Sequence, residues 1–152
     1  MIMEMSRVLN VSMEEMDRFV FDMILEDIKN STGKSESKKK IRSGYSYSKN
    51  LKGRTGSKSR VKTTIRELTS GKYHVTFKSN QGLNHLIYSY VPEDEESIRL
   101  TYSESYEADS KSGGISYKVM NFVYAWSSKR KIKKVLNSIE HIIQENRESQ
   151  EV

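Results

Sequence analysis

Hydrophobic and polar residues alternate along the first positions of the chain. Met3, Met5, Leu9 and Val11 alternate with polar neighbours, and Arg7 is the one residue out of pattern. A period of two is typical of a strand that is buried on one face. The pattern therefore predicts a first strand over residues 3–11.

The pattern then changes to the spacing of a helix. The segment Ser12-Met13-Glu14-Glu15 fits a capping box, in which Ser12 and Glu15 satisfy each other's backbone N–H groups. We predict a helix from Met13 to about Ser31, ended by Gly33, because glycine adopts a positive φ at low cost. Its apolar arc consists of Met13, Met16, Phe19, Val20, Met23, Ile24 and Ile28.

Two aspartates fall within or beside this arc. Asp17 is near the start of the predicted helix, where the helix dipole favours a negative charge. Asp27 is near the end, where the dipole opposes one. We therefore expect Asp27 to need a basic partner, such as Lys29 or a residue of the segment that follows.

Short strands follow residues 34–43, which are polar and predict a loop or a short polar helix. Alternating apolar residues around 45–47, 61–65, 73–77, 83–91 and 98–106 are separated by turn signals that include Ser70-Gly71, Asn80-Gln81-Gly82 and Pro92. Strands with such short connections pair with their neighbours in an antiparallel meander.

The remaining chain has helical periodicity, but its apolar residues change phase. Ile115, Val119, Phe122, Val123 and Trp126 cluster on one side, whereas the residues from Ile132 to Ile143 cluster on another. A straight helix would have to bury two faces. We therefore predict a break or bend near Ser127-Ser128, with a short helix before it and a long one after it.

Composition narrows the range of functions. The chain of 152 residues contains no cysteine, which excludes disulfides, thiolate metal sites and a cysteine nucleophile. No run of about 18 apolar residues is present, and the first residues lack the apolar core of a signal peptide. We expect a cytoplasmic protein. The net charge of +6 favours anionic partners weakly.

The order of these elements resembles the START-like helix-grip superfamily, also called Bet v 1-like or SRPBCC. The opening RVLNVSMEEMDRFVFD is similar to the superfamily's first strand and capped helix. More narrowly, LEDIKNSTGK, LTYSESYE and FVYAWSSKRKIKKVLNSIE resemble a small uncharacterised Firmicutes family, a domain of unknown function. The resemblance implies one α+β domain over residues 1–152. In it, about six antiparallel strands curve around a long C-terminal helix and leave a cavity. It implies no activity.

Tyrosine is the unusual feature of the predicted strands. Seven of the nine tyrosines fall there, and Tyr88 and Tyr90 share a face, as do Tyr102 and Tyr106. Aromatic residues favour strands, so sheet packing alone would explain them. Alternatively, they line a pocket for a small molecule. On this reading the ligand-binding residues are Tyr88, Tyr90, Tyr102, Phe122 and Trp126, with Glu104 or His85 as a polar anchor.

The other polar residues give weaker signals. Glu104 is in phase with Leu100 and Tyr102, so it either points inward or lies at a wet strand end. His74 is predicted to face solvent, and no histidine pair has the spacing of a metal site. We therefore predict no metal, no cofactor and no catalytic residue.

Basic residues gather in two places. One is the segment from Lys34 to Lys62, and the other is the run from Lys129 to Lys134. The run lies opposite the isoleucine stripe of its helix, where any amphipathic helix carries charge. The leading hypothesis is thus non-catalytic binding of a small hydrophobic or amphipathic molecule. The alternative is an interaction protein that uses a basic surface to bind an acidic partner, nucleic acid or a membrane surface.

Overall fold

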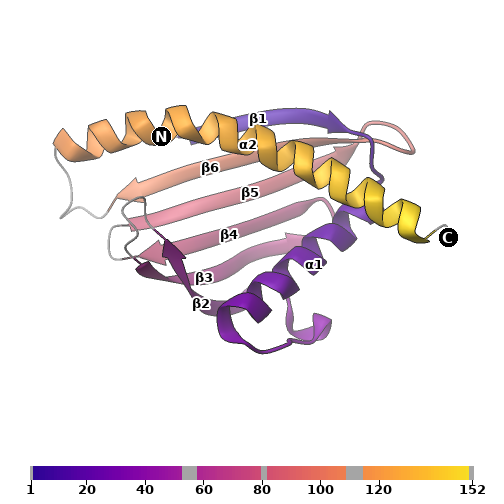
Figure 1. The fold of residues 1–152 in the computed structure, drawn as a ribbon, viewed down its shortest axis with the longest axis horizontal. Coiled ribbons are helices and arrows are strands. Elements are labelled where there is room, and N and C mark those ends of the chain that lie inside the picture. Colours follow the sequence, from indigo (N-terminus) through magenta and orange to yellow (C-terminus); the bar gives the residue numbers. More distant parts are fainter. Residues whose placement is uncertain (1, 53–57, 80–81, 109–114, 151–152) are drawn as a thin grey trace.

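The computed structural model describes residues 2–52, 58–79, 82–108 and 115–150. For residues 2, 51, 52, 58, 59, 108, 115–128, 149 and 150 it describes the backbone only. In these residues a six-stranded antiparallel sheet carries two long helices (Figure 1). In chain order the elements are β1 (Ile2–Leu9), α1 (Met13–Thr32), the short 3₁₀ helix η1 (Lys38–Lys40), β2 (Ser46–Lys52), β3 (Lys58–Thr69), β4 (Lys72–Ser79), β5 (Gly82–Pro92), β6 (Ile98–Ala108) and α2 (Ile115–Gln150).

The strands lie in the order β1-β6-β5-β4-β3-β2. Strands β2 to β6 form the predicted meander, and β1 joins the sheet beside β6. In the register, Tyr73 is opposite Tyr88 and Tyr88 is opposite Tyr102, so the three side chains lie on the same face. Their ring centroids are 6.0 and 5.3 Å apart. The predicted α+β helix-grip architecture is confirmed.

Helix α1 forms as its sequence predicts. The Ser12 hydroxyl accepts a hydrogen bond from the Glu15 N–H at 3.1 Å, and the Glu15 carboxylate accepts one from the Ser12 N–H at 2.9 Å. Gly33 ends the helix with φ of 75°. The side chains that it buries against the sheet are Met16, Val20, Ile24 and Ile28.

Helix α2 is continuous over 36 residues, so the predicted division into two helices at Ser127-Ser128 is wrong. The segment contains neither glycine nor proline, and a change of apolar phase alone does not interrupt the backbone hydrogen bonds. In its second half, the buried side chains are Ile132, Leu136, Ile139 and Ile143. The basic residues from Lys129 to Lys134 are exposed, as predicted for the outer side of an amphipathic helix.

Both helices cover the same face of the sheet. Arg7, the residue out of pattern in β1, is opposite Leu100 on this inner face and donates a hydrogen bond to Asn137 of α2. From α1, Asp17 accepts the hydroxyl of Tyr90, which is also opposite Leu100. Figure 1 shows the helices converging where α1 begins and α2 ends.

Candidate functional site

A cavity of about 160 Å³ lies between α1 and the inner face of the sheet. Apolar and aromatic side chains form most of its wall. It is lined by Met23, Ile24, Asp27, Tyr47, Lys49, Tyr73, Val75, Phe77, Leu86 and Tyr88. The register explains this grouping, because Tyr73 and Tyr88 are opposite each other on β4 and β5, as are Val75 and Leu86. Helix α1 closes the cavity with the side of its apolar arc.

One corner of the cavity is polar. Asp27 Oδ2 accepts hydrogen bonds from the Tyr47 hydroxyl and from Lys49 Nζ, the latter at 3.0 Å. The Lys49 side chain is only 16% exposed, and its ammonium lies 4.8 Å from the centroid of the Phe77 ring. Burial, and then the hydrogen bond to Asp27, raise the pKa of Tyr47 far above its usual range. Tyr47 is therefore a neutral donor at physiological pH.

The neighbouring residue of β3 has a buried hydroxyl without a partner. Thr63 is opposite both Tyr47 and Phe77, which line the cavity. Its side chain is 0% exposed, and its Oγ1 forms no hydrogen bond within the part of the chain that the structure describes. An unsatisfied buried hydroxyl costs about 1 to 3 kcal/mol. Strand β3 therefore contributes one buried hydroxyl beside the cavity wall that has no partner among the described residues.

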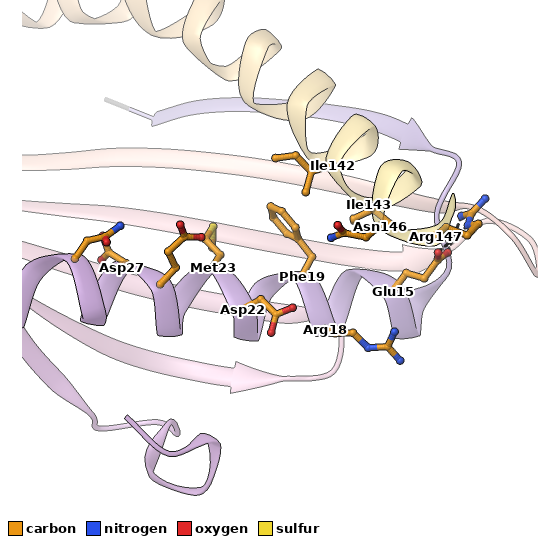
Figure 2. A pocket seen from close by; sticks show the side chains of 12 residues that line it. Glu15, Arg18, Phe19, Asp22, Met23, Asp27, Ile142, Ile143, Asn146 and Arg147 are labelled. Atoms are coloured by element: carbon orange, nitrogen blue, oxygen red, sulfur yellow. Dashed lines mark hydrogen bonds and ion pairs between the residues drawn. The ribbon is translucent and has the colours of Figure 1, made fainter. Parts of the chain in front are cut away.

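A larger groove of about 600 Å³ runs between α1 and α2. Figure 2 shows Phe19 and Met23 extending from α1 towards α2, with Ile142 opposite Phe19. Ile142 is 42% exposed and forms part of the apolar wall of the groove. The groove and the cavity share Met23 and Asp27. The two spaces therefore meet at these residues.

One end of the groove is held by an ion pair. Arg147 of α2 donates to both carboxylate oxygens of Glu15, at 2.7 and 2.9 Å. This hydrogen bond is the largest cause of the pKa of Glu15 being lowered to about 2. The same carboxylate completes the capping box of α1. Glu15 therefore fixes both the start of α1 and the closed end of the groove.

The tyrosines predicted to bind a ligand lie on the inner face, but they have different surroundings. Tyr88 lines the cavity. Tyr90 donates its hydroxyl to Asp17, and Tyr102 donates to Glu104 at 2.7 Å. Neither Tyr90, Tyr102 nor Glu104 lines the cavity or the groove described above. The side chains of Phe122 and Trp126 lie outside the described residues.

The register places His85 on the outer face, away from both helices. It is opposite Thr76 and Ser105, and it alternates with the inner-face residue Leu86. His74 is on the same outer face, where its Nε2 is 3.0 Å from His85 Nδ1. Burial lowers the pKa of His74. His85 therefore cannot anchor a molecule in the inner cavity, because the sheet separates the two.

The family assignment rests on a match over most of the chain. A family model described as Domain of unknown function (DUF3284) matches residues 3–125. The chain is a DUF3284 protein. No curated protein matches this DUF3284 chain.

Solved structures give the fold of this DUF3284 chain. Each of three examples has the same architecture at low identity. A START superfamily protein from Mycobacterium smegmatis is 11% identical with a TM-score of 0.63, over 95% of this chain and 97% of the other. TTHA0849 from Thermus thermophilus is 14% identical with a TM-score of 0.65, over 96% and 99%. SA2116 from Staphylococcus aureus, a protein of unknown function, is 14% identical with a TM-score of 0.64, over 97% and 96%.

Sequence reasoning missed the polar corner of the DUF3284 site. Lys49 belonged to a segment interpreted as a basic surface, yet it faces inward because it is two residues from Tyr47 in β2 and therefore shares its face. Asp27 was expected to need a basic partner, and that partner is Lys49 of β2 rather than Lys29 or the loop after α1. The spacing of Tyr47 and Lys49 was the available signal, since residues two apart in a strand share a face.

The described part of the DUF3284 structure lacks both a metal cluster and a membrane-spanning helix. Among the residues that are described, no group of three or more His, Asp or Glu side chains could hold a metal ion. In those same residues, no helix is long and apolar enough to cross a bilayer.

Proposed function

We propose that this DUF3284 protein binds a small hydrophobic or amphipathic molecule, without catalysis, in the cavity between α1 and the sheet. The observation that carries the proposal is an aromatic cavity with one fixed polar corner, joined to an open groove at Met23 and Asp27. Binding sites typically combine apolar walls with a few placed polar groups in this way. The START-like fold supports the proposal, although fold alone does not assign function.

The dimensions of the cavity limit the bound part of the ligand. A cavity of about 150 Å³ lined by apolar side chains accommodates benzene. The cavity here is about 160 Å³, so it holds one ring or a short branched chain, and the rest of a larger ligand would extend into the groove. Asp27 and Lys49 at the junction would orient the polar part. We retain Tyr88 as a wall residue and propose a cytoplasmic location.

The first experiment is native mass spectrometry of the protein purified from cells, with gentle release of any bound molecule. We expect a discrete additional mass. Leu86→Trp should abolish it by filling the cavity, because Leu86 is part of the wall. Ile87→Trp is the matched control, since Ile87 is the next residue and points to the outer face.

The proposal fails if Leu86→Trp retains the same bound mass as the Ile87→Trp control. A protein without a bound mass would be tested next with a panel of small apolar molecules. The proposal also fails if none of them changes the melting temperature of the protein. Ligands that bind only the folded state must raise that temperature.

A second candidate function rests on the outer side of α2. Lys129, Lys131, Lys133 and Lys134 are exposed, and none forms a salt bridge with a described residue. This cluster could bind an acidic partner, nucleic acid or a membrane surface. Such binding would weaken steeply as salt increases. Replacing two of these lysines with glutamine should weaken it further.

A further inference from the structure

The groove and cavity have the opposite charge from the chain as a whole. The chain carries a net charge of +6. The walls of the two spaces nevertheless hold more acids than bases. The acids are Glu15, Asp22, Glu26 and Asp27, and the bases are Arg18, Lys49 and Arg147.

The bases already have partners. Lys49 is bound to Asp27 at 3.0 Å and Arg147 to Glu15 at 2.7 Å, while Arg18 is 3.7 Å from Glu14. Two carboxylates remain, Asp22 and Glu26, which are one turn apart on α1. Neither forms a salt bridge with a residue that the structure describes. The local field at the groove is therefore negative.

Asp27 offers an acceptor where the groove meets the cavity. Its Oδ2 takes both hydrogen bonds, from Tyr47 and Lys49, and within the described chain its Oδ1 takes none. The side chain of Asp27 is 34% exposed, against 16% for Lys49. The ammonium of Lys49 is enclosed between this carboxylate and the Phe77 ring. An entering molecule thus meets a carboxylate oxygen before it meets the lysine.

A buried hydroxyl lies in β3 beside two residues that line the cavity. Thr63 Oγ1 is buried and has no partner among the described residues, and Thr63 lies between Tyr47 and Phe77 in the register. Buried hydroxyl groups are normally satisfied by protein, water or ligand. Thr63 itself is not among the residues that line the cavity, so its hydroxyl is a polar atom buried beside the wall.

Resting on the proposed function, we propose that the ligand is a small amphipathic amine. Its ring or short chain fills the aromatic cavity, and its ammonium group binds Asp27 Oδ1 in the negative field of Asp22 and Glu26. An anion of the same shape would have to displace Asp27 from Lys49. It would also be repelled by two unpaired carboxylates. The site therefore selects ligands by charge as well as by size.

Three probes of nearly equal shape test this selection: 2-phenylethylamine, 2-phenylethanol and phenylacetate. Isothermal titration calorimetry at low salt should give affinities in that order. Each unpaired surface carboxylate contributes modestly, so we expect the amine to bind about tenfold more tightly than phenylacetate. High salt should reduce the difference.

Variants separate the contributions of the acidic residues and of Lys49 to amine binding. The double variant Asp22→Asn/Glu26→Gln should weaken amine binding severalfold and leave 2-phenylethanol unchanged. Glu95→Gln/Glu96→Gln is the matched control, because it removes two exposed acids that line neither space. Lys49→Gln should strengthen amine binding, since it frees Asp27 of its internal cation. Circular dichroism verifies that each variant is folded.

The outcomes distinguish this inference from the proposed function. The inference is supported if the amine binds most tightly of the three probes, if Asp22→Asn/Glu26→Gln weakens that binding, and if Glu95→Gln/Glu96→Gln does not. Equal affinities, or tightest binding of phenylacetate, overturn the amine selection and leave a cavity binder standing. If none of the three probes binds, the amine selection is overturned. The proposed function is overturned with it only if the purified protein also carries no small molecule and the panel of apolar molecules leaves its melting temperature unchanged.

Discussion

At the scale of single residues, two aspartates fasten α1 to the sheet. Asp17 accepts hydrogen bonds from Tyr90, from the Ser70 hydroxyl at 2.6 Å and from the Gly71 N–H at 3.4 Å. Asp27 does the same for Tyr47 and Lys49 near the other end of the helix. The first aspartate holds a turn in place, whereas the second forms the polar corner of the cavity.

Gly71, which donates its N–H to Asp17, also lies very close to the backbone of Tyr90. It has φ of 91°, and a Cβ at this position would lie 2.9 Å from the carbonyl oxygen of Tyr90. The Gly71 carbonyl in turn accepts the Tyr90 N–H at 2.9 Å. Only glycine combines this conformation with so close an approach.

We predict that Asp17→Ala lowers the free energy of unfolding by about 1 to 3 kcal/mol, because it leaves the Tyr90 hydroxyl without its acceptor. Urea denaturation would measure the loss. Asp22→Ala is the matched control, since Asp22 is exposed on the same helix, and it should change stability by less than about 0.5 kcal/mol. Equal effects of the two changes would contradict this role of Asp17.

The buried phenols predict how stability responds to alkaline pH. Burial is the main cause that raises the pKa of Tyr47, Tyr73, Tyr88 and Tyr90 above the usual value of 10. The unfolded chain loses these protons at a lower pH than the folded protein does. Stability should therefore be unaffected below about pH 9 and fall as the pH rises further.

Denaturation at a series of pH values, followed with tyrosinate absorbance, would test this dependence. Tyr47, Tyr73, Tyr88 and Tyr90 should ionise only as the protein unfolds. Ionisation of all nine tyrosines in one step, with the fold intact, would contradict it.

At the scale of elements, Glu15 couples the start of α1 to the end of α2. Its hydrogen bonds with Arg147 hold its pKa at about 2, against 4.5 for an ordinary glutamate. A lowered pKa means that the stabilisation is complete above pH 4.5 and is lost as the pH falls towards 2.

Glu15→Gln should therefore cost about 2 kcal/mol of stability at neutral pH and almost nothing near the pKa of Glu15. Urea denaturation at both pH values would measure the two costs. Arg147→Met should show the same pH dependence, and the double variant should lose little more than either single change. A cost that is independent of pH would show that the contact is not ionic.

The periodicity of the sequence predicts a helix or strand well where the element buries a single face and is bounded by local hydrogen bonds. The capping box and the arc from Met16 to Ile28 formed as expected, because local hydrogen bonds and one buried face determine them. The break in α2 was inferred from a change of face. That inference failed because a continuous helix without glycine or proline can present different faces to different surroundings along its length.

The candidate site was harder to predict, because it depends on contacts between distant segments. The sequence identified Tyr88 and the aromatic face, which follow from alternation within one strand. It could not pair Asp27 with Lys49, which are 22 positions apart and meet only when β2 packs under α1. His85 was ambiguous because LNHLIYSYV can be read in either phase, and only the register with β4 settles its face.

At the scale of the whole molecule, the groove between the helices adjoins the cavity under α1, because both are lined by Met23 and Asp27. Met23 contributes to the wall of both spaces, so its side chain separates them in part. We therefore expect movement of a molecule between the two spaces to depend on this flexible side chain.

Met23→Ala should widen the passage and increase the association rate of an apolar probe severalfold. Stopped-flow fluorescence would measure the rate. Met5→Ala is the control, because Met5 packs against the core but lines neither space. Equal association rates in the two variants would indicate that a ligand enters by another way.

The position of β1 at the edge of the sheet also affects how the protein folds. Strand β1 is synthesised before the other strands, yet its neighbour is β6, and Ile2 is opposite Ser105. The meander from β2 to β6 can form by short-range pairing as the chain leaves the ribosome, whereas β1 must wait until β6 has been made. Closing so long a loop is slow relative to hairpin formation. The docking of β1 is thus expected to limit the refolding rate, and the strand that is translated first would be the last to join the sheet.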